Sequence, residues 1–210
     1  MTATGAIVLA GGASSRMGRS KAHLDWDGAP LLARVVEAVA PAADLVVVVG
    51  APGQPLPPLG PGVAVARDAR PGRGPLQGML AGLEALAGRA DRVFVSGVDA
   101  PALHPRFVAR VLACLRPGDD AAVPVVEGRS HPLAAAYRAG VEGPVRALLE
   151  ADRLRVHGLL ERLTVRRLSA AELLADPLLA AADPGLASLA NVNTPADYAA
   201  ARAAAAGAVG

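Results

Sequence analysis

Residues 5–25 read GAIVLAGGASSRMGRSKAHLD, and this stretch decides the fold. Its first six residues form a short, continuously apolar run that contains β-branched side chains. Such a run predicts a strand buried on both faces of a parallel sheet. Two glycines, Gly11 and Gly12, follow the strand at once. Ligands of open parallel sheets bind outside the carboxyl ends of the strands, so the loop that begins here is expected to meet a ligand.

Similar apolar runs predict further strands at 44–50, 63–67, 91–97 and 120–126, with helices between most of them at 30–40, 76–88 and 104–116. Pro30 fits the first turn of its helix. Alternating strands and helices favour an α/β fold of three layers, Rossmann-like, with a mostly parallel central sheet flanked by helices.

The pattern changes after residue 127, where a mixed strand is expected in the C-terminal half. We expect strands at 131–138 and 163–168, one or two helices within 141–161 and another at 169–175, a loop at 176–188, and a last helix that starts near Thr194. Residues 1–205 are predicted to form a single domain, and residues 206–210 a frayed tail.

Composition excludes several classes of protein. The net charge of +2, with one Trp, two Tyr and two Phe in 210 residues, gives neither a basic stripe nor a set of stacking platforms, so no nucleic acid is expected. The one cysteine, Cys114, allows no internal disulfide and is predicted to be a buried core thiol. With no signal peptide and no apolar run long enough to span a bilayer, a cytoplasmic protein away from membranes is expected.

Lysine usage is the sharpest compositional feature. Of the 21 basic residues, only Lys21 is a lysine, and it ends the glycine-rich loop. Backbone amides at Gly11 and Gly12, together with Arg16 and Lys21, suit a triphosphate. The loop nevertheless fits neither the Walker A spacing nor the G-x-G-x-x-G pattern. A loop through residues 20–30, ahead of the next helix, would let Lys21 reach back onto phosphates.

The stretch LAGGASSRMGRSKAHLDWDGAPLL (9–32) resembles the N-terminal motif of nucleotidyltransferases with a nucleotide-diphospho-sugar transferase fold, and most of all that of the molybdenum cofactor guanylyltransferases. Four further matches follow in order: RDARPGRGPLQGM (67–79), SGVDAP (96–101), SHPLAAAY (130–137) and NVNTPAD (191–197). The resemblance covers essentially the whole chain.

The resemblance implies a role for each matching residue. The catalytic set would be Lys21, Arg16 and Asp99, with Mg²⁺ held by Asp99. The nucleotide-binding set would be Leu9, Ala10, Gly11, Gly12, Gly18, Lys21, Asp68, Gly74, Gly78 and Asp99. The acceptor-binding set would be Arg155, Asn191 and Asn193.

The residues alone leave other interpretations open. Asp99 fits a Mg²⁺ ligand or a turn residue, and Asp68 fits a partner for the N1 and N2 edge of guanine or a turn carboxylate. The two asparagines fit pterin contacts or helix caps, and Arg155 fits a phosphate contact or a solvated helix face. His131, before a proline, is expected to be structural or to line a substrate site.

Two departures from the family pattern concern the substrates. Gly50 stands where the family often has Asn, so one nucleotide contact is expected to be missing or supplied by backbone. The late motif reads SHPL (130–133), where relatives often have an acidic residue before the His and Thr after the Pro.

The resulting prediction is Mg²⁺-dependent transfer of GMP from GTP to the terminal phosphate of molybdopterin. Molybdenum insertion proteins or molybdoenzyme chaperones would be the protein partners. An acceptor phosphate is already anionic, so the reaction needs positioned cations rather than a strong base. The alternatives are a cytidylyltransferase or a sugar-phosphate nucleotidyltransferase and, in another class, a non-catalytic protein that binds nucleotide or pterin.

Overall fold

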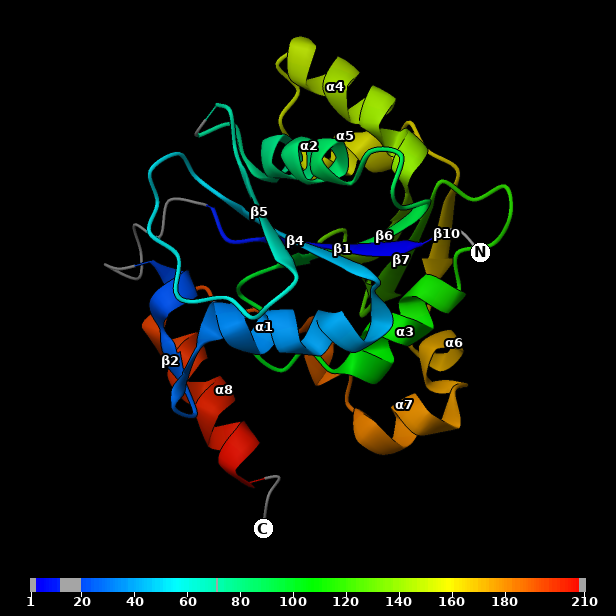
Figure 1. Cartoon of the computed structure of the whole chain (residues 1–210). Coiled ribbons are helices and arrows are strands. Elements are labelled where there is room, and N and C mark those ends of the chain that lie inside the picture. Colours follow the sequence, from blue (N-terminus) through cyan, green and yellow to red (C-terminus); the bar gives the residue numbers. More distant parts are fainter. Residues whose placement is uncertain (1–2, 12–19, 71, 208–210) are drawn as a thin grey trace.

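A central sheet organises the chain, as the computed structural model shows for residues 3–11, 20–70 and 72–207 (Figure 1). The strands follow the spatial order β10-β7-β9-β6-β1-β4-β5, and the short β8 pairs with β7. Their bounds are β1 Thr4–Leu9, β4 Leu45–Gly50, β5 Val63–Arg67, β6 Arg92–Gly97, β7 Ala121–Val126, β8 Arg129–Ser130, β9 Ala134–Arg138 and β10 Val165–Leu168.

The sheet is mostly parallel, as predicted. β1 pairs in parallel with β4 and β6, β4 with β5, and β10 with β7. The antiparallel pairs are those of β9 with β6 and β7, and of β8 with β7. β9 is therefore the mixed strand expected in the C-terminal half.

Helices cover both faces of the sheet and make three layers (Figure 1). One apolar core lies under α2, α4 and α5, and a second lies under α1, α3, α6 and α7. The helix bounds are α1 Leu31–Val39, α2 Pro75–Leu86, α3 Pro105–Ala113, α4 Glu142–Glu150, α5 Val156–Leu160, α6 Ala170–Leu174, α7 Pro177–Ala182 and α8 Pro195–Gly207. Cys114 is buried at the end of α3, as expected.

Two loop predictions are corrected by capping and turn chemistry. Within 176–188, the structure forms α7 and a 3₁₀ turn at Ala187–Leu189. The Asp176 and Pro177 that suggested a loop are the N-cap and first residue of α7, and the Asp176 carboxylate accepts hydrogen bonds from Leu178 and Leu179. Buried Leu179 then anchors the helix to the core.

The other corrected loop is residues 20–30. It contains a 3₁₀ turn at Lys21–His23 and a hairpin of β2 Asp25–Trp26 with β3 Ala29–Pro30. Asp27 and Gly28 both have positive φ, as a tight hairpin turn of this kind requires. Pro30 is the N-cap of α1 rather than a first-turn residue.

The hairpin is held by a small third core, in which buried Trp26 packs edge-on against Tyr198 of α8 at 5.7 Å between ring centroids. α8 continues to Gly207, and residues 208–210 of the expected tail lie outside the described residues.

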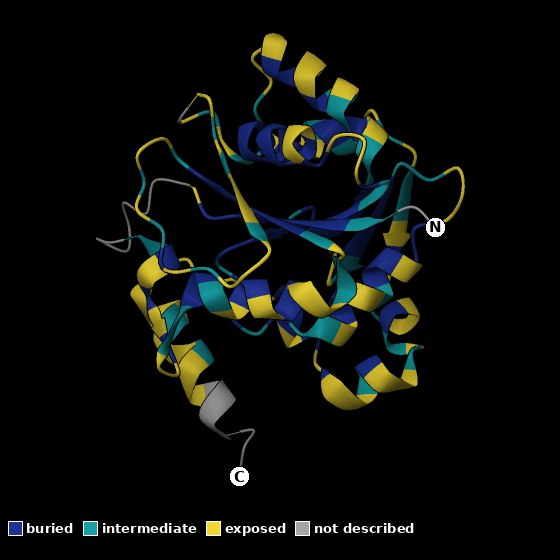
Figure 2. Cartoon of the chain, viewed as in Figure 1, coloured by how far each residue is buried: buried dark blue, intermediate teal, exposed yellow. Residues whose placement is uncertain are grey.

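The expectation that residues 63–67 are buried on both faces is wrong. β5 is the last strand of the sheet, with β4 as its neighbour, and most of its residues are partly or fully exposed (Figure 2). Val65 is 48% exposed. An apolar run of this length can form either an edge strand or a central strand, because the periodicity of a sequence carries no information about strand order.

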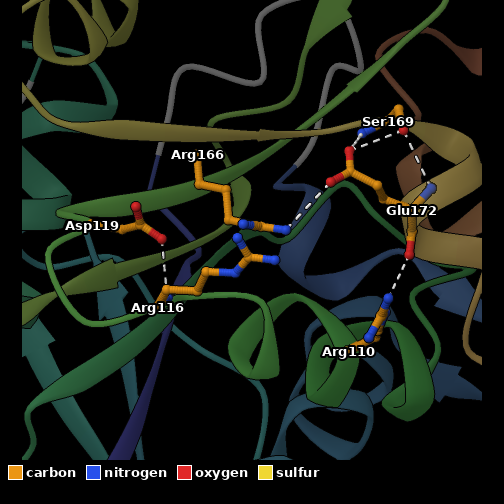
Figure 3. A network of polar contacts seen from close by, with 6 residues as sticks. All are labelled: Arg110, Arg116, Asp119, Arg166, Ser169 and Glu172. Carbon is orange, nitrogen blue, oxygen red and sulfur yellow. Dashed lines mark hydrogen bonds and ion pairs between the residues drawn. The ribbon is translucent and has the colours of Figure 1, made fainter.

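A polar network fastens α6 to α3 and β10 (Figure 3). Ser169 and Glu172 form a capping box at the start of α6, and Arg166 of β10 pairs with the Glu172 carboxylate at 3.3 Å. Arg110 of α3 donates to the backbone carbonyl of Glu172. The hydrogen bond from the Ser169 backbone amide is the main reason that the pKa of Glu172 lies below its usual value.

Close packing of α2 on the central strand gives a stability prediction. A Cβ at Gly82 would lie 2.6 Å from the side chain of Ile7, which is fully buried in β1. Gly82→Ala should therefore lower the free energy of unfolding by about 1–3 kcal/mol, since overpacking outweighs the gain in helix propensity.

Gly143→Ala is the matched control, because Gly143 lies in α4 and a Cβ there would meet nothing within 4 Å. The control should be neutral or stabilising by up to about 1 kcal/mol. Chemical denaturation measures both variants, and an equal effect of the two would contradict the packing described here.

Candidate active site

The carboxyl ends of β1, β4 and β6 lie side by side and form the edge on which the site is built. The register pairs Leu9 with Val49 on one side and with Gly97 on the other. Each strand end leads directly into polar or glycine-containing sequence. Residues that are distant in the chain, such as Gly11, Ala51 and Asp99, therefore meet at one edge.

A cavity of about 640 Å³ opens at this edge, and we call it the first cavity. Its walls contain every described member of the expected nucleotide-binding set, namely Leu9, Ala10, Gly11, Lys21, Asp68, Gly74, Gly78 and Asp99. The remaining members, Gly12 and Gly18, lie outside the described residues, as does Arg16. A concave, largely apolar pocket with a few converging charges is the usual form of a small-molecule site.

Gly11 lies where the chain leaves β1, against the start of the loop after β4. A Cβ at Gly11 would lie 3.2 Å from the Ala51 nitrogen, so the close approach of the two backbones favours glycine. The Gly11 amide donates to the Val49 carbonyl at 3.1 Å. That amide is therefore engaged within the sheet edge, and its expected contact with phosphate stays a prediction.

The N-terminus of α2 faces the same cavity through Gly74, Pro75 and Gly78. Gly74 is the N-cap, with φ of +72°, and Pro75 takes the first helical position. A Cβ at Gly78 would lie 3.1 Å from Leu9, so this glycine lets the helix pack closely on β1. The positive end of the helix dipole favours a negative charge in the cavity.

Asp68 directly follows β5 and makes a turn contact at the wall of the first cavity. Its Oδ1 accepts a hydrogen bond of 2.8 Å from the Arg70 amide, which is a turn contact. Its own amide donates to the Gly50 carbonyl at 2.9 Å, and the residue lines the first cavity. Its carboxylate is therefore fixed at the wall of the cavity.

Lys21 and Asp99 form the charged centre of the site. The Lys21 Nζ lies 3.3 Å from Asp99 Oδ2, with side chains 17% and 25% exposed. A Cβ at Gly97 would overlap Asp99 Oδ1, so glycine at the end of β6 leaves the space for this carboxylate. Lys21 also donates to Asn193 Oδ1 at 3.0 Å.

A second cavity of about 530 Å³ borders this centre through Asn193. It is lined by Arg129, Ser130, His131, Pro132, Leu133, Ala134, Leu189, Ala190, Asn191, Asn193 and Asp197. Leu133 lines both cavities, and Asn193 contacts Lys21 of the first. The two cavities are therefore joined by the contact between Lys21 and Asn193.

The segment that carries the two asparagines is itself fixed to the site. The Val192 amide donates to the Asp99 carbonyl at 2.8 Å. The Asp197 carboxylate accepts from the amides of Asn193 and Thr194 at 3.0 and 2.8 Å. The hydrogen bond from the Asn193 amide is the largest of the effects that lower the pKa of Asp197.

The structure does not group Arg155 with the two asparagines. Arg155 is exposed at the N-cap of α5, and it lines neither cavity. The carbonyl of its neighbour Leu154 lies 3.5 Å from a Cβ placed on Gly74, at the α2 side of the first cavity. Arg155 thus follows a segment that borders the first cavity.

A divalent metal would have to share its ligands with substrate. Among the described residues, no three His, Cys, Asp or Glu side chains gather closely enough to hold a metal ion. Mg²⁺ in nucleotide sites takes one or two carboxylates and completes its shell with phosphate oxygens and water. The hard oxygens of Asp99, at the wall of the first cavity, fit that requirement.

Several lining residues are absent from the expected nucleotide-binding set. They are Val49, Ala51, Gly72, Pro75, Gly97, Val98 and Leu133. Gly97 and Val98 could have been inferred from their place between a strand and Asp99. Leu133 could not, because its place depends on the antiparallel pairing of β9 with β6: it directly precedes β9, and its carbonyl accepts a hydrogen bond of 3.3 Å from the Gly97 amide.

Comparison with known proteins identifies the family. The model of the MobA-like NTP transferase domain matches residues 6–168. The chain belongs to this family. Probable molybdenum cofactor guanylyltransferases from Bacillus licheniformis and Mycobacterium marinum are 33% and 37% identical over 81% and 91% of this chain, covering 87% and 89% of their own lengths. The chain is thus an enzyme of the nucleotidyltransferase class.

Solved structures agree with the fold of a MobA-like NTP transferase. Molybdopterin-guanine dinucleotide biosynthesis protein A from Archaeoglobus fulgidus matches with a TM-score of 0.73, at 23% identity, over 96% of this chain and 98% of that one. A 2-C-methyl-D-erythritol 4-phosphate cytidylyltransferase from Thermus thermophilus matches with 0.68, at 21% identity, over 98% and 100%. No helix in the described part of the chain is both long and apolar enough to cross a membrane.

The second cavity carries a pH prediction. Burial, and then the positive charge of Arg129, lower the pKa of His131 below 6.5. The ring should stay neutral on acidification until below that value. Because the unfolded chain would bind the proton more readily, this residue's contribution to stability is lost as the pH falls from 6.5 through the lower folded pKa.

This pKa is measured by following the histidine ring signals by NMR as the pH is changed. The His131→Gln variant assigns the resonance of His131. Arg129→Gln should raise the His131 midpoint but leave it below 6.5, since burial is the larger cause. A midpoint at or above 6.5 in the unaltered protein would contradict the environment described.

Proposed function

We propose that residues 1–205 act as one nucleotidyltransferase domain that transfers GMP from GTP to the terminal phosphate of molybdopterin. The observation that carries this proposal is the place of Lys21, which lines the first cavity beside Asp99 and donates to Asn193 of the second. The relatives described as probable molybdenum cofactor guanylyltransferases support the choice of both substrates.

The reaction forms one bond and breaks one. An acceptor phosphate oxygen bonds to the α-phosphorus of GTP, and the bond from that phosphorus to the bridging oxygen of pyrophosphate breaks with the electron pair remaining on pyrophosphate. The nucleophile is an anion at neutral pH, so the site needs no strong base. Catalysis then depends on orientation and on neutralisation of charge.

This chain's residues supply both requirements. Lys21 donates hydrogen bonds to phosphate oxygens and stabilises the leaving pyrophosphate, while the N-terminus of α2 favours negative charge in the first cavity. Mg²⁺, held by Asp99, would polarise phosphate oxygens when bound. Arg16 is assigned to the same phosphates. The Asp68 carboxylate can accept two hydrogen bonds from the N1 and N2 edge of guanine, a donor pair that cytosine lacks.

The acceptor is assigned to the second cavity, where Asn191 and the neutral ring of His131 offer donors and acceptors to a polar heterocycle. Asn193 then belongs to both sites through its contact with Lys21. Arg155 has no contact that supports a place in this cavity. Cytoplasmic location and delivery to molybdenum insertion proteins or molybdoenzyme chaperones stay predictions.

The substrates are tested by pyrophosphate release with molybdopterin, Mg²⁺ and each of the four ribonucleoside triphosphates. GTP should support turnover, and Asp68→Asn should lower the ratio of kcat/KM for GTP to that for CTP, because an amide offers one acceptor in place of two. Faster turnover with CTP in the unaltered enzyme would point to a cytidylyltransferase. Turnover with sugar phosphates but not with molybdopterin would show that the acceptor is a sugar phosphate.

The role of Lys21 is tested separately. Lys21→Ala should lower kcat/KM with GTP by about two to three decades, the usual effect of removing a donor that stabilises transition-state charge. Lys21→Arg keeps the charge but changes its geometry, so it should recover part of the loss. Near-normal turnover of Lys21→Ala, with unchanged thermal stability, would remove Lys21 from the mechanism.

A further inference from the structure

Gln54, in the turn after β4, contacts both described ends of the segment that joins β1 to Lys21. Its Nε2 donates to the Ala10 carbonyl at 3.0 Å and to the Ser20 hydroxyl at 3.3 Å. Its Oε1 accepts from the Ala51 amide at 2.9 Å. A single half-buried carboxamide thereby joins the end of β1, the loop after β4 and the residue before Lys21.

The turn that presents Gln54 is fixed from both sides. The Gln54 amide donates to the Ala51 carbonyl at 3.1 Å. Arg67, at the end of β5, donates from Nη1 to the carbonyls of Ala51 and Gln54 at 3.2 and 2.9 Å. A Cβ at Gly50 would lie 2.7 Å from that same Nη1, so glycine leaves room for the guanidinium. Gln54 is therefore attached to the rigid sheet edge through β4 and β5.

The two partners of Nε2 belong to the first cavity and to its approach. Ala10 lines the cavity. Ser20 is the N-cap of the 3₁₀ turn that begins with Lys21, and its hydroxyl meets Gln54 instead of capping that turn. Gln54 is itself absent from the cavity wall, as far as the described residues define it. Its contacts thus act on the backbone that carries Lys21.

We propose that Gln54 is a positioning residue for nucleotidyl transfer. It holds Ala10 and Ser20 at the separation that places the Lys21 ammonium beside Asp99, and it transmits the rigidity of β4 and β5 to that ammonium. The inference deepens the proposed function and rests on it. Preorganised charge stabilises a transition state only when its position is fixed before the reaction.

Three variants separate the contacts of Gln54. Gln54→Glu keeps an oxygen for the Ala51 amide but loses both donors, and Gln54→Met keeps the size but loses every polar contact. Ser20→Ala removes one partner of the pair. Pro58→Ala is the control for the same loop, because Pro58 is exposed and outside the turn.

The experiment is a double-mutant cycle with Lys21→Ala, read as kcat and KM for the nucleotide and the acceptor, with thermal denaturation of each variant. Gln54→Glu and Gln54→Met should each lower kcat/KM for the nucleotide about ten-fold in the unaltered background, the effect of losing roughly 1.4 kcal/mol of positioning. In the Lys21→Ala background the same changes should have less than about a two-fold effect, since the positioned group is gone. Ser20→Ala should fall between, and KM for the acceptor should not change.

Each outcome of this cycle either supports or contradicts the role of Gln54. Equal factors in the two backgrounds would show that Gln54 does not act through Lys21 and would overturn the proposal, as would unaltered kinetics of Gln54→Glu. Absence of turnover in the unaltered protein would instead overturn the proposed function. In that case the dissociation constant of the nucleoside triphosphate is measured with Mg²⁺ for the same variants. Non-additive effects of the Gln54 and Lys21 changes on this constant support the role of Gln54, and additive effects contradict it.

Discussion

The parallel pairing of β1 with both β4 and β6 is the constraint on which the rest of the structure depends. It aligns Leu9 with Val49 and Gly97, so that three chain segments leave the sheet at one edge. Asp99 and Ala51 follow their strands by no more than two residues, which fixes their backbones through the ladder. Lys21 reaches the same edge through a longer path and needs additional contacts to arrive there.

Small residues let the charged centre form at this edge. Gly97 leaves space for the Asp99 carboxylate, Gly11 allows the backbone of Ala51 to approach, and Gly78 and Gly82 allow α2 to pack on β1. A side chain at these positions would press on the Asp99 carboxylate (from Gly97), on the Ala51 backbone (from Gly11) or on β1 (from Gly78 and Gly82). The cavity thus depends on close backbone packing, and the few aromatic residues lie away from its wall.

The sequence predicts the central architecture well because local signals suffice for it. Short β-branched runs mark the buried strands, and the GPLQG segment (74–78) marks the start of α2. The edge position of β5 was missed because an apolar run does not reveal strand order. The hairpin at 25–30 was missed because each strand has two residues, and α7 was missed because Asp176 and Pro177 serve equally in loops and at helix starts.

The site residues likewise include some that local sequence signals predict and others that depend on tertiary contacts. Motif residues at strand ends, such as Asp68 and Asp99, reach one cavity because topology places strand ends together. Gln54 has no local signal, since the two partners of its Nε2 lie 44 and 34 residues away. Arg155 is assigned by resemblance, but tertiary packing leaves it outside both cavities.

Lys21 is proposed to lie where two substrates meet, and because it is the single lysine of the chain its environment can be measured directly. Protein labelled with ¹⁵N only at lysine should give one backbone amide signal, which can be followed as Mg²⁺ with GTP and then molybdopterin are added separately. Each ligand alone should shift this signal, and the two ligands together should give a third position. A signal that responds to neither ligand, or to only one, would contradict a shared site at Lys21.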